Sequence, residues 1–196
     1  MTSSAKYSVG VIGHSQLSPL STEFSAFSTL LQFNRINIRF FSAPGATCTS
    51  IVHTVAYTEI CKWNPHLILV FLGGNDLVYG AEISKVYESL KCLVDELDNT
   101  CKPYFGISVI EPEPRLGNPR YIDISGYRAL RNSLVRKIKD KRYLRFLPLV
   151  KFGISVRTTK ADGVHFNPIG FRCFIIAIRS HISKIIFKNS ISPINI

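Results

Sequence analysis

The stretch LILVFLGGND at residues 67–76 decides the fold of this chain. Its first six residues are apolar without alternation, which is typical of a central parallel strand covered on both faces. The polar pair Asn75 and Asp76 follows the strand almost directly. Because helices must supply the cover on each face, we expect an α/β protein with polar residues at the carboxyl end of a buried strand.

Strands and helices are predicted to alternate along the chain. Short apolar, β-branched or aromatic runs predict further strands at 7–12, 36–41, 104–110 and 143–147. Apolar residues at helical spacing mark the predicted helices: Leu20, Phe24, Phe27 and Leu31 after Ser18-Pro19; Val52, Val55, Ala56 and Ile60; 83–97, ending near Asn99; Tyr127, Leu130, Leu134 and Ile138; and 171–185, capped by Asn167-Pro168. Five strands, each followed by a helix, predict one parallel sheet with right-handed crossovers and helices on both faces.

Length and composition favour one domain. The chain has 196 residues, within the range of a single α/β core, and we assign the domain to 1–185 and an aperiodic tail to 186–196. Five scattered cysteines without a C-x-x-C pair are typical of buried thiols in a reducing compartment and do not predict a metal site. No apolar stretch approaches the ~18 residues that span a bilayer, and 1–8 lack the core of a signal peptide. We expect a cytoplasmic protein, or a domain of a longer polypeptide.

The charge is strongly positive and unevenly distributed. Lys and Arg number 24 and Asp and Glu number 13, which gives a formal net charge of +11. Such an excess attracts phosphate groups or anionic lipid, although a solvated helix face is the simpler interpretation of a charge run. The clustered residues, with only Asp140 against them, are Arg128, Arg131, Arg136, Lys137, Lys139, Lys141, Arg142 and Arg145.

Three polar or glycine positions recur at the ends of predicted strands. Ser15, Gly45 and Asn75 each follow an apolar run and are about thirty residues apart, which is the length of one strand and one crossover helix. Asp162 and His165 lie in the loop after the fifth predicted strand. Because ligands of open parallel sheets bind at the carboxyl ends of the strands, we expect all five residues to meet at one edge.

These residue types together can hydrolyse an ester. A serine hydroxyl needs a base to remove its proton, so Ser15 requires an imidazole, and His165 is the candidate. Asp162, three residues before it in a turn eased by Gly163, can orient the ring. Attack on a carbonyl creates an oxyanion, for which the predicted donors are the backbone N–H groups of Ser15 and Gly45 and the Asn75 amide.

In this order, the stretches Gly13-His14-Ser15, Gly45, 73–76 and 162–165 resemble the four sequence blocks of the SGNH hydrolases, also called the GDSL esterases and lipases. The family's Ser, Gly, Asn and His match Ser15, Gly45, Asn75 and His165. The resemblance implies a three-layer α/β/α flavodoxin-like fold with strand order 2-1-3-4-5. It also implies hydrolysis of short- to medium-chain acyl esters, such as acetyl esters, through an acyl-serine intermediate and without cofactor or metal.

Two positions depart from the family's pattern. Most members have Asp before the serine and Leu after it, whereas this chain has His14 and Gln16, which weakens any transfer of the family's substrate preference. Adjacent residues on an extended segment point to opposite sides, so we predict a structural role for His14. The alternatives are a place in the pocket wall and a hydrogen bond donated to a residue that supports the site. For Asp76 we predict an Asx turn, with a hydrogen bond to backbone near Ser15 as the alternative.

A narrower resemblance concerns the possible partner. The Gly-His-Ser opening, LGGNDL at 72–77, DGVHFN at 162–167 and the basic balance are similar to the esterase domain in the first open reading frame of some animal non-LTR retrotransposons of the chicken-repeat class. This resemblance implies a nucleic-acid-packaging polyprotein, which gives the positive charge a natural partner. The alternative to an esterase is therefore an interaction module that binds nucleic acid or anionic membrane, with esterase activity secondary or lost.

Overall fold

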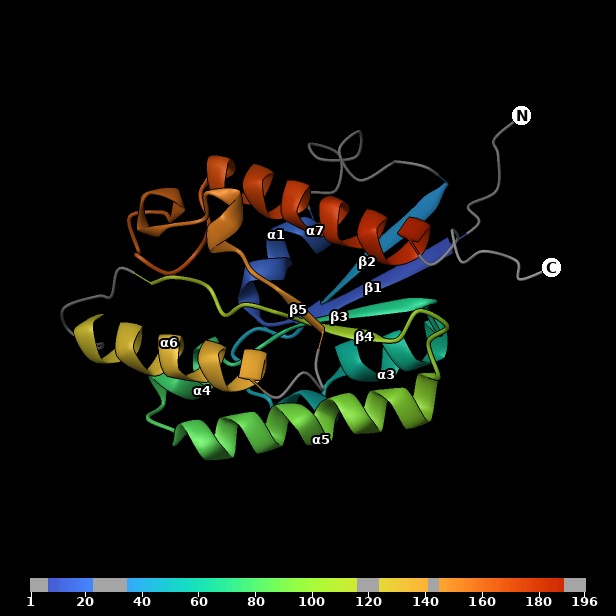
Figure 1. Cartoon of the computed structure of the whole chain (residues 1–196), viewed down its shortest axis with the longest axis horizontal. Coiled ribbons are helices and arrows are strands. Elements are labelled where there is room, and N and C mark those ends of the chain that lie inside the picture. Colours follow the sequence, from blue (N-terminus) through green and yellow to red (C-terminus); the bar gives the residue numbers. More distant parts are fainter. Residues whose placement is uncertain (1–6, 23–34, 116–123, 141–144, 189–196) are drawn as a thin grey trace.

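A parallel sheet of five strands forms the middle layer of the computed structural model, which describes residues 7–22, 35–115, 124–140 and 145–188. The strand order is β2-β1-β3-β4-β5 (Figure 1), which confirms the predicted order and fold class. Every neighbouring pair is parallel. The strands are β1 (Tyr7–Gly13), β2 (Ile36–Ser42), β3 (Leu67–Phe71), β4 (Ile107–Ile110) and β5 (Arg145–Leu147).

Helices cover both faces of this sheet (Figure 1). One face carries α1 and α7, and the other carries α3, α4, α5 and α6. The helices are α1 (Ser18–Thr22), α3 (Val55–Trp63), α4 (Gly74–Val78), α5 (Ile83–Cys101), α6 (Ile124–Asp140) and α7 (Pro168–Lys188), and the short 3-10 helices are η1 (Ser15–Leu17), η2 (Ser50–His53), η3 (Val150–Phe152) and η4 (Val156–Thr158). Among the described helices, none is long and apolar enough to cross a membrane.

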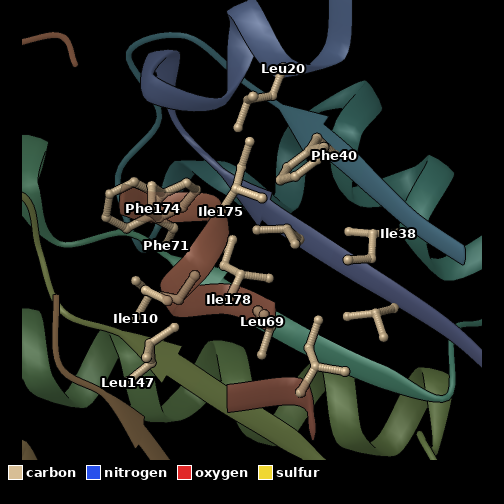
Figure 2. Packing of buried hydrophobic residues seen from close by; sticks show 14 of the residues in the cluster. Leu20, Ile38, Phe40, Leu69, Phe71, Ile110, Leu147, Phe174, Ile175 and Ile178 are labelled. Atoms are coloured by element: carbon tan, nitrogen blue, oxygen red, sulfur yellow. The ribbon is translucent and has the colours of Figure 1, made fainter. Parts of the chain in front are cut away.

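The central strand β3 is fully buried, as its unbroken apolar run predicts. Leu69 and Phe71 pack with Phe174 and Ile178 of α7 in one core cluster (Figure 2). Ile68 and its alternating neighbours belong to the cluster on the other face, with α3 and α5. Burial of an apolar side chain of this size contributes roughly 1.5–3 kcal/mol to the free energy of folding. Packing on both faces therefore stabilises β3 in the middle of the sheet.

The predicted stripe Val52, Val55, Ala56 and Ile60 packs against the core except at Val55, and the single helix predicted over it is interrupted. The chain forms η2 before α3, and the side chain of Thr54 caps α3 by accepting a hydrogen bond from Tyr57 N. This interruption changes the phase of the helix, so that Val55 is 73% exposed. The prediction placed Val55 on the buried face because it assumed one regular helix through η2 and α3.

Two other element boundaries differ from the prediction. β4 begins at Ile107 because Gly106 has φ +75°, which an extended strand does not adopt, and the preceding Tyr104 is exposed. α7 continues past Ile185 to Lys188, and Ile186 is buried, so the helix enters the segment 186–196 that was predicted as a tail. Of the first predicted helix, α1 is described, whereas Phe24, Phe27 and Leu31 lie outside the described residues.

The close pairing of β1 and β3 makes Gly13 sensitive to substitution. A Cβ atom at Gly13 would lie 2.5 Å from the Phe71 carbonyl oxygen, and the two residues are register partners in the sheet. We therefore expect Gly13→Ala to lower the free energy of unfolding by about 1–3 kcal/mol, as overpacking does, in urea titrations. The control is Ser84→Ala on the exposed surface of α5, which should change stability by less than ~0.5 kcal/mol. A Gly13→Ala variant as stable as this control would contradict the close approach.

Candidate active site

The candidate nucleophile lies directly after β1. His14 has an extended backbone, and its carbonyl oxygen accepts a hydrogen bond from Leu17 N at 3.0 Å, which closes the tight turn η1. Ser15 begins this turn and is half-buried. Strand and turn therefore place the Ser15 side chain at the carboxyl edge of the sheet, where the sequence predicts a site.

Within the predicted triad, His165 lies within hydrogen-bonding distance of both Ser15 and Asp162. His165 Nε2 is 3.0 Å from Ser15 Oγ, and His165 Nδ1 is 2.8 Å from Asp162 Oδ2. The other carboxylate oxygen, Asp162 Oδ1, accepts hydrogen bonds from the backbone N–H groups of Val164 and His165, both at 2.9 Å. The fold thus brings a hydroxyl from one end of the chain to an imidazole and a carboxylate from the other.

The Asp162 carboxylate determines which nitrogen of the ring can act as a base. Burial raises the pKa of Asp162, but the hydrogen bonds from Val164 N and from His165 outweigh it, so the pKa lies below its ordinary value. An ionised carboxylate accepts only, and Nδ1 of the neutral ring must therefore carry the proton. This tautomer leaves Nε2 with a lone pair directed at the Ser15 hydroxyl.

Gln16 holds the loop of the candidate base against the candidate nucleophile. Its side-chain nitrogen donates to the Val164 carbonyl oxygen at 2.5 Å, and its side-chain oxygen accepts from Phe166 N at 3.0 Å. The amide therefore binds the residues on both sides of His165. Sequence reasoning treated Gln16 only as a departure from a pattern, because nothing local indicates a contact 150 residues away.

The two further candidates for an oxyanion hole lie beside each other. Gly45 follows β2 in a turn with φ +77°, a conformation that favours glycine. Asn75 lies in the first turn of α4, and its Nδ2 donates to the carbonyl oxygen of Ala46, the residue after Gly45, at 3.0 Å. The structure thus joins the Asn75 amide to the Gly45 turn.

Asp76 makes a contact that neither of the two predictions described. Both of its carboxylate oxygens lie 3.1 Å from Cys48 N, in the loop after the Gly45 turn. Asp76 is 6% exposed, and burial raises its pKa, although the hydrogen bond from Cys48 N opposes the rise. The predicted Asx turn is therefore wrong, because the side chain joins α4 to a distant loop.

His14 points away from the Ser15 hydroxyl and into a buried network of charged side chains. Its Nε2 lies 3.2 Å from Glu113 Oε2, and both side chains are fully buried. Glu113 in turn binds Arg115, whose Nη2 donates to Asn75 Oδ1 at 2.9 Å. Burial raises the pKa of Glu113, but its interactions with His14 and with the Arg115 guanidinium outweigh burial and keep the pKa well below its usual range.

Sequence reasoning missed Glu113 and Arg115. They lie in the segment that follows β4, to which we assigned no strand or helix, and the available signal was a run of charged residues and prolines directly after a buried strand. His14 faces Glu113 and therefore does not join Asp162 and His165 as a third metal ligand. Within 7–22, 35–115, 124–140 and 145–188, no three potential ligand side chains gather as a metal site.

The basic region is smaller than the sequence predicts. Arg131 is 6% exposed, its Nη2 lies 3.0 Å from Glu111 Oε1, and its Nε donates to Pro112 O. Arg131 thus belongs to the interior, because it falls at helical spacing with the buried residues of α6, Tyr127, Leu134 and Ile138. Arg128, Arg136, Lys139 and Arg145 are exposed and Lys137 is half-buried, while Lys141 and Arg142 lie outside the described residues.

Comparisons with known proteins agree on the fold. No protein-family model and no curated protein matches the chain. Among solved structures, a lipase/acylhydrolase from Enterococcus faecalis is 16% identical, with a TM-score of 0.70 over 90% of this chain and 95% of that one. A GDSL-like lipase from Bacteroides thetaiotaomicron is 16% identical (TM-score 0.67, 91% and 88%), and an acetylxylan esterase from Geobacillus stearothermophilus is 15% identical (0.62, 93% and 96%). The chain therefore has the fold of the GDSL lipase and acylhydrolase structures.

Proposed function

We propose that this protein is a serine esterase that hydrolyses short- to medium-chain acyl esters. The observation that carries the proposal is the chain of two short contacts, 3.0 Å from Ser15 Oγ to His165 Nε2 and 2.8 Å from His165 Nδ1 to Asp162 Oδ2. Nucleophile, base and orienter in this geometry are what acyl transfer through a serine requires. The fold shared with lipases and esterases supports the same reaction class.

The proposed reaction proceeds in two steps. Ser15 Oγ attacks the ester carbonyl while His165 Nε2 takes the hydroxyl proton, and Asp162 stabilises the imidazolium that forms. Collapse of the tetrahedral intermediate transfers this proton to the leaving alcohol and leaves an acyl-serine. Water, activated by His165, then releases the acid and restores the hydroxyl.

We assign the oxyanion of the tetrahedral intermediate to three donors, the backbone N–H groups of Ser15 and Gly45 and the Asn75 side chain. An amide nitrogen has two N–H bonds, and the Ala46 carbonyl oxygen accepts one of those on Asn75. The other is available for the developing charge. Such donors are typically worth ~10²- to 10³-fold in turnover each.

Substitution of Ser15 tests the proposed nucleophile. Ser15→Ala should reduce hydrolysis of p-nitrophenyl acetate at least ~10³-fold, because no other described hydroxyl lies against His165 Nε2. The same variant should lose covalent labelling by a phosphonate inhibitor, measured by intact mass. Ser18→Ala is the matched control, since the Ser18 hydroxyl contacts Ser42 instead, and it should keep wild-type activity. Full activity in Ser15→Ala would reject the esterase assignment.

Substitution of Asp162 tests the proposed orienting carboxylate. Asp162→Asn should lower kcat by roughly 10³–10⁴, because an amide N–H facing Nδ1 favours the tautomer whose Nε2 cannot accept a proton.

The same carboxylate should make stability depend on pH. The pKa of Asp162 is lower in the folded chain than its ordinary value of 3.8. The ionised carboxylate therefore stabilises the fold at pH values above 3.8, and this effect is lost as the pH falls through the folded pKa.

The wild-type advantage in unfolding free energy over Asp162→Asn should therefore shrink between pH 6 and pH 3 in urea titrations. It should stay under about 1 kcal/mol, because the Asp162 side chain is 46% exposed and solvent screens it. An advantage that is equal at both pH values would show that the carboxylate is not stabilised by folding.

As a second function we propose binding of nucleic acid through phosphate contacts, which the narrower resemblance to retrotransposon esterase domains also favours. A groove of about 650 Å³ between β5, η3 and α7 is lined by Lys139, Lys151 and Lys184 and by no acidic residue. Burial and the charges of Lys184 and Arg145 lower the pKa of His181 in this groove to about 4. The local potential is therefore strongly positive.

Salt dependence tests this binding. Three phosphate contacts predict a loss of affinity of about 20-fold between 50 and 200 mM salt for a fluorescent single-stranded RNA. Lys139→Glu with Lys184→Glu should abolish the binding, whereas Lys102→Glu, which directly follows α5 and does not line the groove, should weaken it only slightly. Affinity that does not change with salt would exclude phosphate contacts, and esterase activity can be measured separately in the same variants.

A further inference from the structure

The side-chain amide of Asn75 lies between two partners of opposite hydrogen-bonding character. Arg115 Nη2 is 2.9 Å from Asn75 Oδ1, and the Ala46 carbonyl oxygen is 3.0 Å from Asn75 Nδ2. A guanidinium has no acceptor and a carbonyl has no donor. A flipped amide would therefore lose both hydrogen bonds, because its nitrogen would face the Arg115 donor and its oxygen would face the Ala46 carbonyl oxygen. The chemistry of the two neighbours therefore fixes the direction of the amide.

Arg115 is itself immobilised. Its Nε donates to Glu113 Oε1 at 2.8 Å, and its Nη2 contacts the same oxygen. The guanidinium carbon also lies 5.6 Å from the centroid of the Tyr127 ring, and the side chain is 5% exposed. A planar group that is held on its edge and on its face has one available orientation.

Glu113 connects this arginine to the candidate nucleophile. Its second oxygen, Oε2, lies 3.2 Å from His14 Nε2, and its carbonyl oxygen accepts a hydrogen bond from the Tyr127 hydroxyl at 2.9 Å. A Cβ atom at Gly74, the residue before Asn75, would lie 2.6 Å from Glu113 Oε1. Only glycine at this position leaves room for the carboxylate beside the first turn of α4.

We infer that Arg115 is a positioning residue for the oxyanion donor Asn75, and that Glu113 and His14 hold Arg115 in place. The inference rests on the proposed esterase function. With Oδ1 bound by a cation and one N–H bound by Ala46, the remaining N–H has a fixed direction before substrate arrives. A donor that is fixed in advance stabilises developing charge without reorganisation, and the guanidinium polarises the amide so that it donates more strongly.

Kinetics of single and double variants test the inference. Arg115→Met should lower kcat for p-nitrophenyl acetate about 10- to 100-fold with little change in KM, and Arg115→Lys should restore part of the loss. Asn75→Ala should lose ~10²- to 10³-fold, as expected for a missing donor. If Arg115 acts through Asn75, the double variant should be within about threefold of Asn75→Ala alone. A double variant that shows the product of the two losses would overturn the inference.

A matched control separates positioning from general stability. Arg131 is also a buried arginine paired with a glutamate, Glu111, on the same side of the sheet, and its side chain contacts Glu111 and the Pro112 carbonyl oxygen rather than Asn75. Arg131→Met should therefore be destabilised in thermal unfolding and keep wild-type kcat in its folded fraction. A fall in kcat equal to that of Arg115→Met would assign the effect to lost stability and overturn the inference.

A measurement without substrate keeps the two proposals separate. Since loss of the Arg115 cation can unfold the chain, Glu113→Gln with Arg115→Met removes both charges. In either folded variant, the two side-chain N–H resonances of Asn75, identified by their absence in Asn75→Ala, should shift and exchange with water at least tenfold faster. Unchanged resonances would overturn the inference whatever the activity. Changed resonances in a protein that neither hydrolyses esters nor labels with a phosphonate would leave the coupling intact and reject the esterase function.

Discussion

Burial of β3 on both faces is the constraint on which the candidate site depends. Helix α7 packs on one face and α3 and α5 on the other, so β3 must pair with a parallel strand on each edge. The β1 pairing sets Gly13 opposite Phe71, which aligns the carboxyl ends of the two strands. Ser15 and Asn75 are therefore brought to the same edge by packing that is distant from either side chain.

The parts of the structure that could be predicted are those encoded by local patterns. Apolar runs predict the strands, and polar residues directly after them predict the edge at which Ser15, Asn75 and His165 gather. The parts that could not be predicted depend on contacts between distant side chains. The contact of Asp76 with Cys48 N and the burial of Arg131 against Glu111 require the tertiary arrangement. Residue type alone favours a turn for the first and a solvated surface for the second.

The residues on either side of Ser15 hold two different parts of the site. His14 contacts Glu113, and through Arg115 this contact reaches the Asn75 amide. Gln16 binds the backbone on both sides of His165. The departures from the family pattern at 14 and 16 therefore have one physical explanation. Each side chain connects the turn of the candidate nucleophile to a different part of the chain, one that bears the proposed donor Asn75 and one that bears the candidate base.

The contacts around His14 and those around His165 differ in their exposure to solvent. The network of His14, Glu113 and Arg115 is almost completely excluded from solvent, where an unpaired charge is costly and the geometry has few alternatives. The side chains of Asp162 and His165 are 46% and 35% exposed, where water competes for every hydrogen bond and one contact between them stabilises the loop little. The loop of the candidate base therefore depends on backbone hydrogen bonds and on the buried Gln16 amide for its position, because the contact between Asp162 and His165 is too exposed to fix it.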